Sequence, residues 1–182
     1  MSESCTAYVA LGGNIGTEAE ITERFSDAIA ALSRLQGIGQ IQISRIYRSS
    51  AWGPIAQNDY LNCVICFECS ITAPELLQQL LKIEQNFGRT RSDEQRWGPR
   101  TLDLDILLFG RQIHAQPDLQ LPHPRMHQRL FVLLPLADLA PELNIKDHGH
   151  IRDLVSACCM QAVAALAVVP INATINTMGD LQ

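Results

Sequence analysis

Residues 96–110, RWGPRTLDLDILLFG, place two carboxylates inside an otherwise apolar run. The part from Thr101 to Phe109 has the length and the bounding glycines of a β-strand, in which side chains alternate between two faces. This alternation puts Asp103 and Asp105 side by side on one face, with their Cα atoms about 6.6 Å apart. Unpaired, the two carboxylates would repel each other and resist burial, whereas a hard cation removes both penalties. The pattern therefore predicts a pair of Mg²⁺ ligands on a strand.

Complementary positive charge lies close to the two acids in the sequence. Half of the basic residues, seven of fourteen, fall between Arg89 and Arg129, and all seven are arginines. Arginine holds phosphate oxygens in a bidentate fork, and the segment around Gly98 and Pro99 is typical of a loop. Metal-binding carboxylates beside phosphate-binding arginines are the components of a phosphoryl-transfer site. The alternative is a structural salt-bridge network of Arg100 with the two aspartates.

Length and composition limit the remaining possibilities. With 182 residues, 47% of them hydrophobic, the chain fits a single domain (1–182) with a substantial core. A net charge of −5 argues against a nucleic-acid-binding protein, which needs a basic face. The N-terminus has no basic signal-peptide region, and the weakly polar run 157–170 is too short to span a bilayer. We therefore expect a cytoplasmic protein that binds neither nucleic acid nor membrane.

Three of the six cysteines have a spacing that needs a separate interpretation. Cys63, Cys66 and Cys69 match the C-x₂-C-x₂-C start of an iron–sulfur motif, but the fourth cysteine position is Ala73. Their apolar neighbours favour a strand, on which Cys63 and Cys66 point to opposite faces and cannot hold one metal jointly. We expect free cysteines buried on a strand. The alternative is a metal-binding or iron–sulfur module.

Hydrophobic periodicity predicts the order strand, helix, strand, strand, helix, strand. The strands are expected at 8–11, 41–47, 59–68 and 101–109, and the helices, each opened by a capping box, at 17–35 and 72–87. A turn at Gly12 and Gly13, both free to take positive φ, is expected after the first strand. A short strand at 119–121, a helix from about Arg125 to Pro141, and a helix from 151 to about 168 would follow. This order is typical of an α+β, ferredoxin-like antiparallel sheet with its two helices on one face.

Two long segments, 96–110 and 121–132, resemble the signatures of the 6-hydroxymethyl-7,8-dihydropterin pyrophosphokinase family. Shorter matches are Leu11-Gly12-Gly13-Asn14, Tyr47-Arg48, Gly53-Pro54 and Asp59-Tyr60-Leu61-Asn62. The resemblance covers residues 8 to about 143 and implies a ferredoxin-like fold, with a C-terminal extension at about 151–182. It also implies that a monomer transfers pyrophosphate from ATP to 6-hydroxymethyl-7,8-dihydropterin in folate biosynthesis, giving AMP and the pterin pyrophosphate.

The resemblance further assigns the site residues, by their positions in this sequence. Asp103 and Asp105 would hold two Mg²⁺ ions, and the catalytic arginines would be Arg89 and Arg100. Contacts with ATP are implied for Glu84, Arg91, Trp97, Arg100, Ile106, His123 and Arg129. Contacts with the pterin are implied for Ser49, Trp52, Tyr60, Asn62 and Phe131. Tyr60 and Phe131 would stack on the two faces of the ring, and Asn62 would read its polar edge.

Two other functions remain open at this point. Nucleotidyl transferases also combine an Asp-x-Asp pair, Mg²⁺ and a glycine turn. In them the turn usually comes shortly before the acids, whereas here Gly13 and Asp103 are ninety positions apart. An inactive member of the resembled family, retained for a partner, is the second alternative, and the intact acid pair together with Arg100 argues against it.

Overall fold

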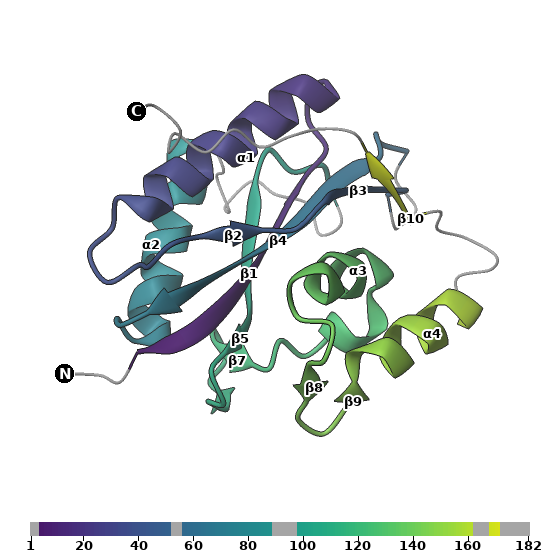
Figure 1. Ribbon diagram of the computed structural model, residues 1–182. Helices are drawn as coiled ribbons and strands as arrows, with labels where there is room; N and C mark the ends of the chain where they lie inside the picture. The colour runs from purple at the N-terminus through teal and green to yellow at the C-terminus, as the bar shows by residue number, and fades with distance from the viewer. Residues whose placement is uncertain (1–3, 52–55, 89–97, 162–167, 172–182) are drawn as a thin grey trace.

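The computed structural model describes residues 4–51, 56–88, 98–161 and 168–171, and one antiparallel sheet organises them (Figure 1). In spatial order the sheet contains β10 (Val168–Ile171), β3 (Ile46–Ser49), β4 (Tyr60–Cys69), β1 (Cys5–Gly13) and β5 (Asp103–Phe109), and β2 (Gln42–Ile43) also pairs with β4. The order β3-β4-β1-β5 is that of a ferredoxin-like sheet. The predicted α+β fold class is therefore confirmed.

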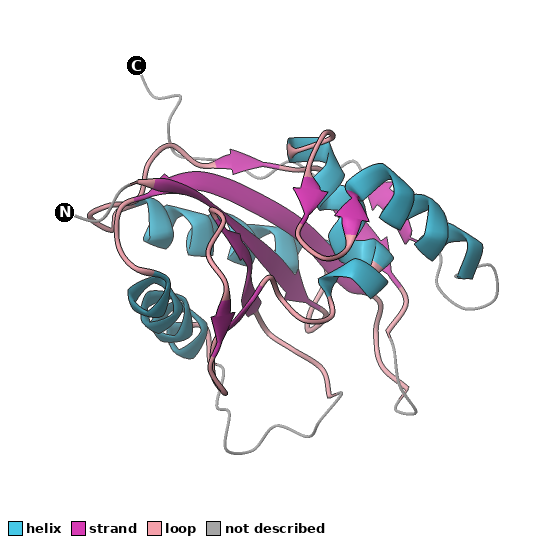
Figure 2. Ribbon diagram, turned by 90° about the horizontal axis from the view of Figure 1, so that it is seen from below, coloured by secondary structure: helices cyan, strands magenta, loops and turns pink. Residues whose placement is uncertain are grey.

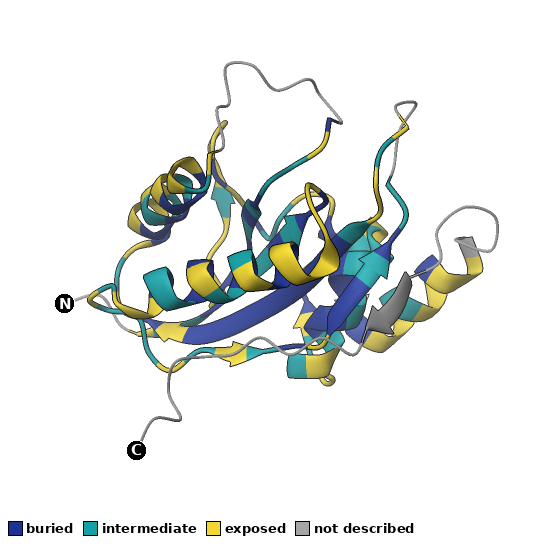
Figure 3. Ribbon diagram, turned by 90° about the horizontal axis from the view of Figure 1, so that it is seen from above, coloured by how far each residue is buried: buried dark blue, intermediate teal, exposed yellow. Residues whose placement is uncertain are grey.

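Two long helices, α1 (Glu18–Ser33) and α2 (Ala73–Asn86), cover one face of the sheet (Figure 1). Each begins at a complete capping box, formed by Thr17 with Glu20 and by Thr72 with Glu75, so both predicted starts are confirmed. The side of α1 that faces away from the sheet is largely exposed, while the strands beneath are buried (Figure 3).

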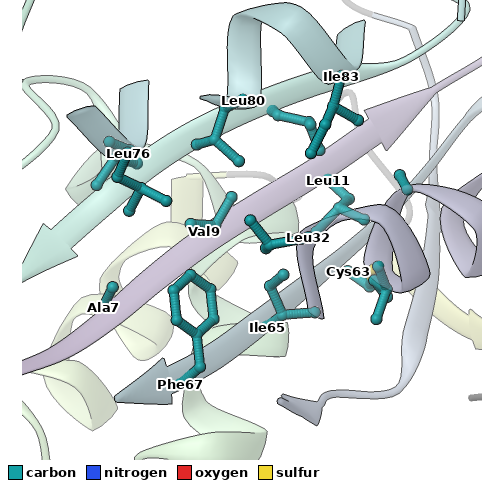
Figure 4. Close-up of a cluster of buried hydrophobic side chains, with 14 of the residues drawn as sticks. Ala7, Val9, Leu11, Leu32, Cys63, Ile65, Phe67, Leu76, Leu80 and Ile83 are labelled. Carbon is teal, nitrogen blue, oxygen red and sulfur yellow. The ribbon is translucent and has the colours of Figure 1, made fainter. Parts of the chain in front are cut away.

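The apolar stripes of these helices pack on the strands as the main core (Figure 4). Its members come from both helices and the central strands, and those labelled in Figure 4 are Ala7, Val9, Leu11, Leu32, Cys63, Ile65, Phe67, Leu76, Leu80 and Ile83. All of them are at most 6% exposed. Burial of this apolar surface removes it from water, which is the dominant favourable contribution to folding.

A second layer covers part of the opposite face of the sheet. It contains α3 (Leu130–Leu139) and α4 (Ile151–Gln161), which Figure 2 shows gathered at one end of the sheet. The short 3₁₀ helix η1 (Met126–Gln128) precedes α3. Two small hairpins, β6 (His114–Ala115) with β7 (Gln120–Leu121) and β8 (Asn144–Ile145) with β9 (Gly149–His150), complete the fold. The second core lies beneath this layer and includes Val64, Leu108, Met126, Leu133 and Leu136.

Strand β5 contributes side chains to both cores, because the alternation of its side chains between the two faces changes at a bulge. Leu104 and Ile106 belong to the main core, and Asp103 and Asp105 lie on the opposite face, as the sequence predicts. The register with β1 then shifts by one residue, which leaves Leu107 as the extra residue of the bulge. Leu107 at the bulge and Leu108 after it belong to the second core, and Phe109 returns to the main core. The acid pair therefore occupies the part of this face that precedes the second core.

Two predictions about the first turn and the later helices are wrong. Strand β1 runs through Gly12 and Gly13, and neither glycine has a positive φ; that conformation first occurs at Gly16, with a φ of 102°. The helix expected from Arg125 is divided into η1 and α3, which begins only at Leu130.

The C-terminal part of the chain also differs from the prediction. The last helix, α4, ends at Gln161, and Val168, expected within the helix, begins β10. Strand β10 pairs with β3 and forms an edge of the main sheet. Four consecutive apolar or proline residues do not distinguish a short strand from a continuing helix, because only the pairing partner decides between them.

The cysteine-rich segment is a strand, as predicted. Cys63 and Cys69 are fully buried in the main core, and all six cysteines are free thiols. Burial raises the pKa of the Cys63 thiol far above its ordinary value and that of Cys69 to about 11.

Among the described residues, none of the helices combines the length and apolar character needed to cross a membrane.

Candidate active site

The register of three strands aligns an amide, a glycine and a carboxylate in one row across the sheet. Gly12 of β1 pairs with Asn62 of β4 on one side and with Asp103 of β5 on the other. A Cβ atom at Gly12 would lie 3.6 Å from the Asn62 Oδ1 atom and 3.9 Å from the Asp103 Cβ atom. Two strand spacings put the Cα atoms of Asn62 and Asp103 about 10 Å apart. Glycine thus places no side chain between the predicted pterin-reading amide and the predicted metal ligand, and we call this part of the sheet surface the strip.

The hydrogen bonds of Asn62 fix which atom faces this strip. Asn62 is 6% exposed, and its Nδ2 atom donates to Ser49 Oγ at 2.9 Å and to the Tyr47 carbonyl at 3.5 Å. The amide oxygen is the atom that lies next to Gly12. A carbonyl oxygen with no hydrogen of its own can only accept. The Tyr47 carbonyl can only accept, so it requires the Nδ2 atom on its side, and together with Ser49 it orients Asn62 to present an acceptor to a ligand in the strip.

Tyr60 links this side of the site to the segment that precedes the acids. The residue begins β4, and its hydroxyl donates to the Gly98 carbonyl at 3.1 Å. Tyr60 and Phe131, the two predicted stacking residues, are both partly exposed. The Arg129 guanidinium carbon lies 5.7 Å from the centre of the Phe131 ring, within the range of a cation–π contact.

Asn14 connects three loops, although the sequence analysis did not assign it to the site. Its side chain is 1% exposed, and its Oδ1 atom accepts from the Arg100 N–H at 2.7 Å. The Nδ2 atom donates to Gln57 Oε1 and to the Asn58 carbonyl, both at 3.0 Å. In addition, the Asn14 N–H donates to the Arg100 carbonyl at 2.9 Å. The only signal for this role in the sequence was the position of Asn14 in the early glycine motif.

The two carboxylates belong to an electrostatic group with His123 and Arg129. Burial, followed by the charges of Arg129 and Arg125, lowers the pKa of His123 to about 4, although Asp103 opposes this shift. Burial also lowers the pKa of Arg129, against the raising effect of Asp105 and Asp103. His123 is therefore neutral at pH 7, whereas Arg129 remains a cation.

The tautomer of His123 follows from its neighbours. Its Nδ1 atom accepts from the Arg125 N–H at 3.2 Å, so that the ring proton resides on Nε2. The backbone N–H of His123 donates to the Leu107 carbonyl of β5 at 2.9 Å, which holds the residue at the outer edge of that strand. His123 can thus offer a neutral N–H donor close to the acid pair.

Two predicted ATP contacts are placed differently from the others. Ile106 is 5% exposed in the main core, on the opposite face from the acids, so that only its backbone is left for the predicted contact. Glu84 is 1% exposed, and its carboxylate accepts from the Leu104 N–H at 2.7 Å. The structure thus gives Glu84 a structural contact with β5, and its contact with ATP stays a prediction. Trp52, Arg89, Arg91 and Trp97 lie outside the described residues.

The donor set of the site fits magnesium. Mg²⁺ usually takes one or two carboxylates and completes its octahedron with water and phosphate oxygens. Asp103 and Asp105 are partly exposed neighbours on one strand face. Within the part of the chain that the structure describes, no group of three or more His, Cys, Asp or Glu side chains is suited to hold a metal. A cation at the acid pair would therefore take its other ligands from water and substrate.

Comparison with solved structures supports the fold. The wild-type HPPK-DHPS protein of Plasmodium falciparum, solved with pterin and p-hydroxybenzoate, aligns with 88% of this chain at a TM-score of 0.64 and 14% identity. A triple mutant of the same protein with STZ-DHP aligns with 89% at a TM-score of 0.67 and 14% identity. This chain spans less than half of those proteins, covering 43% and 44% of them.

Sequence comparisons identify the family. The family model described as 7,8-dihydro-6-hydroxymethylpterin-pyrophosphokinase (HPPK) matches residues 8–141 of this sequence. A 2-amino-4-hydroxy-6-hydroxymethyldihydropteridine pyrophosphokinase of Pseudomonas aeruginosa is 43% identical over 159 residues, which are 87% of this chain and 95% of that protein. The protein of that name from Synechocystis is 48% identical over 75% of this chain and 67% of its own length. The one from Haemophilus influenzae is 41% identical over 82% of this chain and 91% of its own length. The chain therefore belongs to the 7,8-dihydro-6-hydroxymethylpterin-pyrophosphokinase family.

Proposed function

We propose that this protein transfers the β,γ-pyrophosphoryl group of ATP to the hydroxymethyl group of 6-hydroxymethyl-7,8-dihydropterin. The observation that carries this proposal is the row Asn62–Gly12–Asp103, in which an amide oxygen and a carboxylate lie on either side of a glycine. A substrate that has a flat polar ring at one end and a reacting hydroxyl at the other fits a site of this length.

The pterin side of the site provides stacking and an oriented acceptor. Tyr60 and Phe131 would hold the two faces of the ring, since flat heterocycles are bound by offset or edge contacts with aromatic side chains. The Asn62 oxygen would accept from the amino edge of the pterin, and the Tyr47 carbonyl, which can only accept, disfavours the flipped amide. This part of the site fixes the direction in which the hydroxymethyl group points.

The phosphate side combines two carboxylates with arginine and histidine side chains. Asp103 and Asp105 would hold two Mg²⁺ ions, and the bound metal would neutralise phosphate charge and orient the attacking hydroxyl. Arg100 and Arg129 would bind phosphate oxygens, and His123 would donate its Nε2–H without adding a charge. The segment around Arg100 is held by Asn14, which places this arginine relative to the pterin side.

The reaction balances as a single displacement. The substrate hydroxyl oxygen forms a bond to the β-phosphorus while the bond from the β-phosphorus to the oxygen shared with the α-phosphate breaks. AMP leaves with that oxygen, the hydroxyl proton passes to water, and the β- and γ-phosphates remain on the pterin. Positioning and charge neutralisation supply most of the acceleration in such transfers.

Analysis of the nucleotide product tests the proposal. The protein, ATP, Mg²⁺ and 6-hydroxymethyl-7,8-dihydropterin are incubated together, and AMP and the pterin pyrophosphate are quantified for the wild type and for Asp105→Ala. We expect equal amounts of the two products from the wild type and none from the variant. ADP as the product would overturn the reaction type, and no pterin-dependent turnover by the folded wild type would overturn the proposed function.

A further inference from the structure

A polar clamp joins the C-terminal end of α3 to β3. The Asp138 carboxylate accepts from the Tyr47 hydroxyl at 3.1 and 3.0 Å and from the Arg45 guanidinium at 2.5 to 3.2 Å. The backbone N–H of Arg45 donates to the same carboxylate at 3.2 Å. The Arg45 guanidinium carbon also lies 5.4 Å from the centre of the Tyr47 ring. We call Arg45, Tyr47 and Asp138 the α3 clamp.

Burial makes the hydroxyl–carboxylate bond the stronger part of the α3 clamp. Tyr47 is 2% exposed and the Asp138 side chain 17%, whereas the Arg45 side chain is 64% exposed. Burial and the bond to Asp138 raise the pKa of Tyr47 to about 12, so its hydroxyl remains a donor at all physiological pH values. Charge-assisted hydrogen bonds that are shielded from water are stronger than exposed ion pairs, which water and salt weaken.

The strand end of the α3 clamp leads directly to the pterin side of the site. Tyr47 pairs with Asn62 across β3 and β4, and the Tyr47 carbonyl accepts from Asn62 Nδ2 at 3.5 Å. The same residue therefore contacts Asp138 through its side chain and the ligand-reading amide through its backbone. A shift of Tyr47 would be transmitted to Asn62 over one strand spacing.

Through α3, the clamp is also connected to Phe131, the residue proposed to stack on the pterin ring. Asp138 and Phe131 are seven positions apart on α3, so they share one side of the helix at a separation of about 10 Å along its axis. The helix has ten residues and no side-chain hydrogen bond at its N-cap, and Pro135 supplies no N–H for the Phe131 carbonyl. So short a helix is marginal by itself, and tertiary contacts must fix its position.

We propose that Asp138 is a positioning residue for pterin recognition, which through Tyr47 sets the gap between Phe131 on α3 and Asn62 on the sheet. A flat ring sandwiched between the two sides of a site needs that gap to be fixed, and losing one charge-assisted bond corresponds to about tenfold in binding. The ATP side has a separate anchor, since His123 is hydrogen-bonded to β5. The inference rests on the proposed function and adds specificity to it.

The experiment measures KM for both substrates and the dissociation constant for the pterin in four single variants and in the double variant Asp138→Ala/Tyr47→Phe. Asp138→Ala removes the acceptor, Tyr47→Phe removes only the hydroxyl, and Asp138→Glu restores a carboxylate. Glu142→Gln is the matched control, because it breaks another carboxylate–arginine pair, with Arg152, that has no contact with Tyr47 among those described. Thermal unfolding of each variant sets an assay temperature at which all are folded.

We expect a rise of about tenfold in KM and Kd for the pterin in Asp138→Ala and a smaller rise in Tyr47→Phe, with KM for ATP within about twofold. The double variant should be no worse than Asp138→Ala alone, because both residues act through one contact. Asp138→Glu should recover most of the affinity, and Glu142→Gln should match the wild type.

Three results would overturn the inference. These are an unchanged pterin affinity in both Asp138→Ala and Tyr47→Phe, an equal rise in KM for both substrates, which indicates general loosening, and additive effects in the double variant. A wild type that binds pterin but forms no AMP would refute the proposed function alone. In that case Kd, measured by calorimetry, still decides the role of Asp138.

Discussion

Replacement of Gly13 by alanine should destabilise the protein although the residue lies in a strand and has no special φ. The Cβ atom of Gly13→Ala would lie 2.8 Å from the Thr101 carbonyl oxygen and 3.7 Å from the Arg100 carbonyl oxygen. Ordinary contacts begin at about 3.4 Å, so the backbone must move by about 0.6 Å at Thr101, and a main-chain oxygen cannot rotate away as the end of a side chain can. Overpacking of this kind costs about 2 kcal/mol. The same shift would move the backbone at Thr101, next to Arg100, for which we propose a contact with phosphate.

Gly12→Ala provides the matched control one residue earlier on the same strand. Its Cβ atom would meet only ordinary contacts, at 3.6 Å from Asn62 Oδ1 and 3.9 Å from Asp103 Cβ. Alanine also loses less conformational freedom on folding than glycine, so stability should be unchanged or slightly higher. The methyl group would instead occupy the strip in which we propose that substrate binds, and we expect a loss of about tenfold or more in kcat/KM.

Thermal unfolding followed by circular dichroism, together with the AMP assay, separates the two effects. For a chain of this size, about 2 kcal/mol corresponds to a fall in Tm of about 4–8 °C. We expect that fall in Gly13→Ala and an unchanged Tm with low activity in Gly12→Ala. A Gly13→Ala variant that unfolds within 1 °C or so of the wild type would refute the contact argument, as would a fully active Gly12→Ala.

Three further variants test other parts of the site. Because the pKa of His123 is lowered to about 4, the unfolded state binds its proton first as pH falls. The wild type should therefore lose about 2 kcal/mol of stability between pH 7.5 and 5 that His123→Gln does not lose, measured by urea unfolding at both pH values; parallel curves would contradict this. Asn14→Ala leaves buried loop groups unpaired and should cost about 2–4 kcal/mol in urea unfolding and lower kcat, and a neutral effect would show that the loops are held otherwise. Asp105→Asn should raise the Mg²⁺ concentration for half-maximal activity at least about tenfold without lowering Tm, and an unchanged Mg²⁺ titration would exclude it as a ligand.

The fold was predictable because its main elements carry local signals. The two capping boxes and the helical periodicity that follows them need only residues within one or two turns, and α1 and α2 begin where these signals place them. The alternation around Asp103 and Asp105 was equally local. The failures occurred where the local signal is ambiguous. A short apolar segment such as that of β10 becomes a strand only because β3 offers an unpaired edge.

The glycine motif shows that prediction from the local sequence also fails within the candidate site. From the sequence, two adjacent glycines indicated a turn in which both were free to take positive φ. In the structure, both lie in β1, where Gly12 leaves room between Asn62 and Asp103 and Gly13 leaves room for the Thr101 backbone. The requirement for glycine comes from the close approach of neighbouring chain segments, and that cannot be calculated before the register of the strands is known.

By itself, the sequence determined the acid pair on one strand face, the family and the types of residue at the site, because these depend on order and spacing along the chain. Only the tertiary structure decided that Asn62, Gly12 and Asp103 form one row, that Asn14 joins three loops, and that burial keeps His123 neutral. These properties depend on strand register and on solvent exclusion. Both arise from contacts between residues far apart in the sequence, and the free energy of those contacts is defined only once the chain has folded.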